Sequence, residues 1–153
     1  MKIIIGIFFL FLCTFIGYNL SLKYTKRKIF YGNFFNFNEK LLREVSFLQT
    51  TIVSLLNDID INTDFYDSLK HYVNTKEFKF DKQYLLEEEK NELNRYFKTI
   101  GTSDKIGQLE YLSSMDITLK NKRIQTEENE KKYRMLYIKM GFLIGLIILI
   151  ILL

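Results

Sequence analysis

Few side chains in this chain could do chemistry, and they are widely spaced. His71 is the only histidine, and it follows Asp67 by one helical turn, a spacing at which a carboxylate can orient an imidazole. A hydrolase would need a further partner, and the candidate is a carboxylate from a cluster of glutamates on the next predicted helix. A surface histidine is the commoner interpretation, and a membrane-bound hydrolase is kept as the enzymatic alternative.

The cluster of glutamates on the third predicted helix can be interpreted in two ways. A di-iron carboxylate bundle would also need Glu-x-x-His pairs, which the chain lacks. The cluster is therefore expected to be a solvated acidic face, or else a docking surface for a basic partner. Its members are Glu87, Glu88, Glu89 and Glu92.

Cofactor and metal motifs are absent from the sequence. Gly101 and Gly107 do not have the spacing of a phosphate-binding loop, and no Gly-Lys-Ser/Thr follows them, which argues against an ATPase. Cys13 is the only cysteine, so it can form neither an internal disulfide nor a cysteine-based zinc site. We expect no catalytic residues, no cofactor and no metal.

Composition and hydropathy indicate the elements that hold these residues. The 153 residues include no proline, which favours an all-α fold. The 20 residues from Ile3 to Leu22 carry no charge and make a helix of about 30 Å, enough to cross a bilayer. The 14 uncharged residues from Met140 to Leu153 predict a second, shorter span. An export signal is less favoured at the N-terminus, because only Lys2 precedes the apolar run and no A-x-A site follows it.

Basic residues flank both spans on the side of the intervening segment. By the positive-inside rule, residues 23–139 are expected in the cytoplasm, with residues 1–22 and 140–153 as transmembrane helices and both termini outside. The flanking charges are interpreted as lipid-headgroup anchors, and the rest of the segment is too nearly balanced in charge for nucleic-acid binding. These anchors are Lys23, Lys26, Arg27, Lys28, Lys131, Lys132, Arg134 and Lys139.

Apolar spacing predicts an antiparallel helical bundle between the spans. A continuous helical stripe is formed by Phe34, Phe37, Leu41, Val45, Leu48, Ile52 and Leu55. Asn36 and Glu39 offer a capping box for this helix, and an earlier start in the Phe-rich segment is the alternative. Asn62 and Thr63 can cap a short helix that buries Phe65, Leu69 and Tyr72. A third helix, capped by Asp81, is expected to bury Leu86, Leu93, Phe97 and Ile100 and to end at Gly101.

The last predicted helix begins at Lys105, after a cap at Ser103, and meets no proline before the chain ends. Its core stripe is Ile106, Leu109, Leu112, Met115 and Leu119. The polar stretch from Ile124 to Tyr133 is predicted to be a solvated stem with i,i+4 ion pairs, or alternatively a flexible linker. Those pairs are Glu127 with Lys131, Glu128 with Lys132, and Glu130 with Arg134. The stretch also breaks the heptad pattern that a coiled-coil tether would need.

Two further sets of residues are candidate interaction sites. The turn between the last two helices, with Gly101, Asp104 and Gln108, is the predicted tip of an αα-hairpin and a candidate docking site. In the spans, small residues allow helix backbones to approach closely, for packing either on each other or on another membrane subunit. They are Gly6, Cys13 and Gly17 in the first span and Gly141 and Gly145 in the second.

From about Glu92 onward the sequence resembles the stage III sporulation protein AB family of endospore-forming bacteria. The resemblance is carried by Tyr96, Ile100, Gly101, Asp104, Gln108, Lys132, Tyr133, Gly141, Phe142, Leu143, Gly145 and Leu146. The stretch from Asn57 to Leu86 departs from that pattern, and Phe97 stands where the family commonly has glycine.

The resemblance implies a non-enzymatic, platform-like subunit of the sporulation channel between mother cell and forespore. The family's cytoplasmic domain is similar to the helical platform (F) domain of type II secretion machines. Stage III sporulation protein AA is then the expected ATPase partner, with other membrane subunits beside it, and the mother-cell membrane around the forespore is the expected location. A generic membrane-anchored scaffold or tether remains the alternative.

The charge pattern makes a topological prediction. A reporter enzyme fused after Leu153 should be active only outside the cytoplasm, and the same reporter inserted near Lys76 only inside it, because eight basic residues lie on the inner flanks. Paired alkaline phosphatase and β-galactosidase fusions measure this. The opposite pattern would contradict the membrane hairpin.

Overall fold

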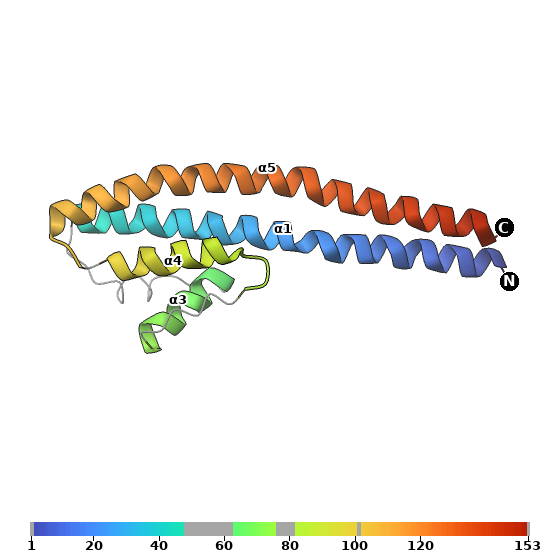
Figure 1. The fold of residues 1–153 in the computed structure, drawn as a ribbon, viewed down its shortest axis with the longest axis horizontal. Helices are drawn as coiled ribbons and strands as arrows, with labels where there is room; N and C mark the ends of the chain where they lie inside the picture. Colours follow the sequence, from blue (N-terminus) through green and yellow to red (C-terminus); the bar gives the residue numbers. More distant parts are fainter. Residues whose placement is uncertain (1, 48–62, 76–81, 101, 153) are drawn as a thin grey trace. The chain divides into compact units, whose positions relative to one another are not determined.

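The computed structural model describes residues 2–47, 63–75, 82–100 and 102–152, and within these ranges the chain is all-α. Four helices are present in the described residues: α1 (Lys2–Phe47), α3 (Asp64–Thr75), α4 (Glu87–Thr99) and α5 (Lys105–Leu152) (Figure 1). The prediction of an all-α chain with long apolar helices at both ends is confirmed.

The first helix is longer than expected. The prediction of a new helix starting at a capping box of Asn36 and Glu39 is wrong, because α1 runs unbroken through both residues. No glycine or proline pair interrupts the sequence between the apolar run and Asn36, and a lone Gly32 is tolerated inside a helix. The part of the predicted stripe at Leu48, Ile52 and Leu55 lies outside the described residues.

The chain divides into two compact units, each built partly from α1 and partly from α5. A membrane unit contains residues 1–28 and 124–153, and a core unit contains residues 29–123. These units are defined by contacts within the chain. The ends of the transmembrane helices at residues 22 and 140 rest on hydropathy instead, and they stay predictions.

The core unit is held together by aromatic rings. The ring of Phe34 lies 5.4 Å from that of Phe65 on α3 and 4.8 Å from that of Tyr96 on α4, measured between centroids. Phe37 packs on Phe97 with a centroid distance of 6.0 Å. Aromatic pairs at such distances stabilise a core beyond the area that they bury, which compensates for the lack of alanine in these helices.

A polar network crosses this apolar core. Asn38 is fully buried, and its side-chain amide donates to the backbone carbonyl of Leu112 (3.1 Å) and to Asp116 Oδ1 (3.4 Å) on α5. The Tyr96 hydroxyl donates to Asn38 Oδ1 at 2.8 Å. Burial raises the pKa of the Tyr96 phenol well above its usual value, so this proton donor stays intact at physiological pH. The network thus ties α1, α4 and α5 together in one register.

One helix start and one capping residue differ from the prediction, whereas α5 begins at Lys105 as predicted. α4 begins at Glu87 rather than near Asp81, and the Glu89 carboxylate accepts a hydrogen bond from the Leu86 backbone N–H at 3.1 Å. α5 is capped by Asp104 instead of Ser103, because Asp104 Oδ1 accepts from the Gly107 N–H at 3.1 Å. Glu89 thus pairs with the backbone N–H of the residue before α4, whereas Asp104 caps α5 directly.

Most of the predicted core residues that the structure describes are buried or half-buried, and two are exposed. Leu93, Phe97, Leu112 and Leu119 lie in the core, as do Phe65 and Leu69 of α3. The prediction fails for Leu86, which is 56% exposed, and for Ile106, which is 68% exposed. Both lie at or next to a helix N-terminus, where the helical period no longer decides which way a side chain faces.

The Asn38 network predicts a specific sensitivity. Tyr96→Phe removes the donor to Asn38 Oδ1 and leaves a buried amide oxygen without its partner, which should lower the free energy of unfolding by about 1–3 kcal/mol. Tyr66→Phe, also in the core, is the matched control and should cost under about 1 kcal/mol. Thermal melts of the full chain in detergent, followed by circular dichroism, compare the two. Equal melting shifts would contradict a special role for the network.

Candidate functional site

The contacts that the structure describes for His71, the central residue of the hydrolase hypothesis, are local to α3. His71 Nδ1 lies 3.1 Å from the Thr75 hydroxyl, on the exposed end of α3, and Asp67 is exposed as well. The described residues contain no group of three or more potential metal ligands. The contacts of His71 are those of a surface residue at a helix end.

The acidic cluster on α4 is not uniformly solvated. Glu87, Glu88 and Glu92 remain at least partly exposed, but Glu89 is only 2% exposed, which corrects the expectation for that residue. Its carboxylate closes the start of α4 and lies 3.5 Å from Lys122 Nζ on α5. A buried carboxylate needs such partners, so the role of Glu89 is to link α4 to α5.

Residues 102–104, which lead into α5, are exposed. Gly101, the predicted end of the third helix, lies outside the described residues, and α4 ends at Thr99 with Ile100 following it. Asp104 is exposed and caps α5, and the Gln108 side chain donates to the Ser103 carbonyl at 2.8 Å. The structure therefore brings Asp104 and Gln108 together on one turn.

In the membrane unit, α1 and α5 touch backbone to backbone at their glycines. A Cβ atom added to Gly17 would lie 2.5 Å from the Tyr137 carbonyl oxygen, and one added to Gly141 would lie 2.5 Å from that of Cys13. At Gly145 the nearest atom is the Cα of Leu10, at 2.8 Å. Small residues at these positions let the two backbones approach, and no larger side chain fits without moving a helix.

Gly6 differs from the other three glycines. Its nearest neighbour is the Cδ1 atom at the far end of the Leu149 side chain, which can rotate away. The predicted small-residue positions therefore all lie on facing sides of the two helices, but the tight backbone contact is confined to Gly17, Gly141 and Gly145.

A charged cluster joins the same two helices at the polar end of the membrane unit. Glu130 is 6% exposed and accepts hydrogen bonds from Arg134 (3.0 Å), Thr25 (3.3 Å) and Lys28 (3.5 Å). Burial acts to raise the pKa of the Glu130 carboxyl, but Arg134, Lys28 and Thr25 together outweigh burial and hold the pKa below its usual value. Glu130 is therefore ionised at neutral pH.

This cluster corrects the prediction of a solvated stem. Residues 124–133 are helical, and the ion pairs of Glu127 with Lys131 and Glu130 with Arg134 form. Thr126 and Glu130, however, are buried in the membrane unit. Of the predicted headgroup anchors, Lys28 and Arg134 are thus engaged with Glu130 and Arg27 is half-buried, while the others are exposed: Lys23, Lys26, Lys131, Lys132 and Lys139.

The apolar ends of α1 and α5 are both long and apolar enough to cross a membrane. Only 11% of the most apolar window of each helix is buried, whereas the core helix of a soluble protein would be mostly covered. A family model described as stage III sporulation protein AB matches residues 2–153. The chain belongs to this family. No curated protein and no solved structure matches it.

Family membership extends the resemblance noted from the sequence. The match includes the stretch from Asn57 to Leu86, which departs from the pattern seen in the C-terminal half. As a member of the stage III sporulation protein AB family with two apolar helices, the chain is a sporulation-related membrane protein.

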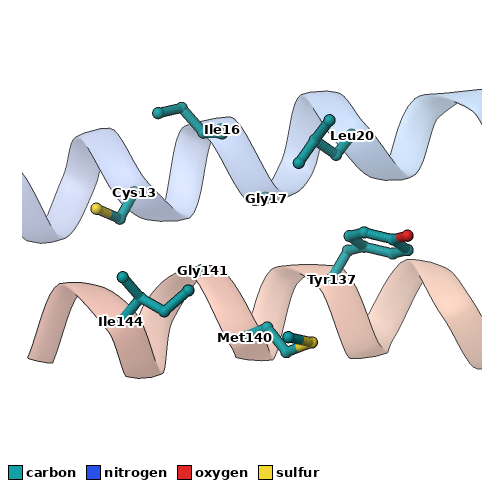
Figure 2. Close-up of a pocket in the computed structure, with 8 residues that line it drawn as sticks. All are labelled: Cys13, Ile16, Gly17, Leu20, Tyr137, Met140, Gly141 and Ile144. Carbon is teal, nitrogen blue, oxygen red and sulfur yellow. The ribbon is translucent and has the colours of Figure 1, made fainter. Parts of the chain in front are cut away.

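An apolar recess in this family member was not anticipated from the sequence. It has a volume of about 310 Å³ and lies beside the contact of Gly17 with Gly141 (Figure 2). Its walls are Cys13, Ile16, Gly17 and Leu20 of α1 and Tyr137, Met140, Gly141 and Ile144 of α5. The G-x-x-x-G pattern locates the contact, but the recess depends on the side chains around it.

The glycine geometry predicts unequal effects of the same substitution. Gly17→Ala or Gly141→Ala should weaken the helix pair by about 1–3 kcal/mol, because the new methyl group meets backbone atoms that cannot rotate away. Gly6→Ala, the matched control, should be tolerated. Disulfide yield between Tyr24→Cys and Tyr133→Cys, whose rings stack at 5.1 Å, reports pairing in a Cys13→Ser background. Equal yields in all three variants would show that glycine contact does not set the spacing.

Proposed function

We propose that this chain is a non-enzymatic platform subunit of a sporulation-specific, secretion-like channel between mother cell and forespore, and that its helical core unit docks a cytoplasmic ATPase of the stage III sporulation protein AA type. Family membership supports a role in sporulation, and the two apolar helices support a place in the membrane. The positive flanks favour a cytoplasmic core unit in the mother cell, with both termini on the far side of its membrane.

The observation that carries docking is the exposed turn between α4 and α5. Its polar residues are already paired locally: Asp104 with the Gly107 N–H, and Gln108 with the Ser103 carbonyl. Side chains that are already paired at the start of α5 lose little conformational entropy when a partner binds, which favours recognition.

Ile106 adds apolar surface to the same turn. It was expected in the core but is 68% exposed in the first turn of α5, two residues after the cap. Burial of one isoleucine side chain is worth about 1.5–3 kcal/mol, enough for an interface anchor. The tip therefore offers an apolar residue next to a carboxylate, Asp104, which suits a partner with an apolar and basic surface.

The docking test compares two isoleucines on one helix. Ile106→Gln should weaken binding of the purified ATPase to the full chain in detergent by about tenfold or more. Ile117→Gln, at a position 65% exposed on the same helix, is the matched control and should bind as the unaltered chain does. Biolayer interferometry measures both. Equal weakening would place docking elsewhere, and no binding by the unaltered chain would overturn the ATPase proposal.

A second pair of variants separates the two roles of Asp104, which are capping α5 and contacting the partner through its charge. Asp104→Asn keeps a capping side chain but removes the charge, whereas Asp104→Ala removes both and should cost about 0.5–2 kcal/mol of stability. If the charge contacts the partner, Asp104→Asn should weaken binding severalfold while the chain melts almost normally. Normal binding by Asp104→Asn would reduce this residue to a structural cap.

A further inference from the structure

The recess beside the glycine contact has a polar end. On α1, Ile16, Leu20 and Lys23 follow one another at intervals of four and three residues and so lie along one side of the helix. Ile16 and Leu20 line the recess, and Lys23 is exposed one turn beyond it. The Lys23 ammonium lies 5.1 Å from the centre of the Tyr24 ring and 5.4 Å from that of Tyr137, which is itself a wall of the recess.

The length of this feature matches one leaflet of a bilayer. Lys23 follows Cys13 by ten positions along the helix, a rise of about 15 Å, or half of a hydrocarbon core of about 30 Å. A transmembrane helix of a partner would follow α1 and α5 over the full thickness. An apolar recess of half that length, with a cation and two tyrosine rings at its outer end, has the dimensions and polarity of a single lipid.

We propose that this recess binds one anionic phospholipid, with an acyl chain between Leu20 and Met140 and the headgroup phosphate against the Lys23 ammonium. The charge of Lys23 selects the anionic headgroup. Tyrosine beside this lysine suits the same position, because its ring is apolar and its hydroxyl is polar, as a residue at a membrane–water interface requires. This site is independent of the docking proposed for the α4–α5 turn.

A second recess on the same helix pair is the competing position. It has a volume of about 400 Å³ and is lined by Thr14, Ile138, Lys139, Phe142 and Leu143. Its lysine forms part of the wall, at the level of the apolar residues, whereas Lys23 lies beyond the apolar walls of the first recess, where a headgroup belongs. Substitution of Lys23 or of Lys139 therefore shows which of the two recesses binds the lipid.

The chain contains no tryptophan, so a single one reports on the recess. Leu20→Trp places the fluorophore in the recess wall, and Phe11→Trp, at a position 69% exposed, places it at the general lipid surface. The full chain is reconstituted in phosphatidylcholine vesicles containing a minor fraction of acyl-brominated phosphatidylglycerol or acyl-brominated phosphatidylcholine. Bromine quenches the fluorophore only on close approach.

Quenching of Leu20→Trp should require about fivefold less brominated phosphatidylglycerol than brominated phosphatidylcholine, the factor expected for one lysine near an anionic headgroup. Phe11→Trp should be quenched equally by both lipids. Adding Lys23→Gln to Leu20→Trp should remove the preference, whereas Lys26→Gln or Lys139→Gln should leave it.

Three results would overturn the proposal. They are equal quenching of Leu20→Trp by the two lipids, loss of the preference with Lys139→Gln instead of Lys23→Gln, and protection of Leu20→Trp from both lipids. The last result would mean that a protein helix occupies the recess. Unchanged helical circular dichroism of each variant shows that the comparison is made on folded protein.

Discussion

The membrane unit depends on the contact of α1 with α5 at Gly17 and Gly141. In a bilayer the lipid tails are as apolar as the side chains, so two helices gain nothing from the hydrophobic effect when they pair, and close packing must hold them. Glycine supplies that packing by letting Cys13 and Tyr137 present backbone atoms directly to the opposite helix. The stacking of Tyr24 on Tyr133 and the partners of Glu130 follow along the same seam, so the spacing set by the glycines also fixes these polar contacts.

In the core unit, buried polar groups select one arrangement of the helices. There the aromatic rings supply nonspecific attraction, because Phe34, Phe65 and Phe97 could stack in more than one arrangement. Asn38 removes that freedom, since its amide reaches a backbone carbonyl and a carboxylate of α5 and accepts from Tyr96 of α4 only in one register. Lys122 near Glu89 adds a second fixed point between α4 and α5. Satisfied polar groups in a core stabilise little in themselves, but they specify one arrangement.

The helical content, the two apolar helices and the existence of an exposed turn before α5 could be predicted from the sequence, because they depend on residue type and period alone. Helix starts were less predictable: Asp81, Asn36 and Ser103 are all good caps, and the choice of Asp104 or of Glu89 as the capping group depends on packing that no local pattern contains. The burial of Glu130 was missed for the same reason. Its ion pair with Arg134 is a local signal, whereas Thr25 and Lys28 reach it from the far end of the chain.

That sequence separation has a consequence for biosynthesis. The hydrogen bond from Thr25 to Glu130 joins residues 105 positions apart, and the glycine contacts join segments still farther apart in the chain. At a translation rate of about 5–20 residues per second, the first apolar helix waits on the order of ten seconds before its partner emerges from the ribosome. During that interval the face that bears Gly6 and Gly17 is open to any other helix in the membrane. Correct pairing therefore depends on timing as well as on shape. Because the last helix is tethered to the first in one chain, its effective concentration near the first helix is high, and this must favour it over other helices in the membrane.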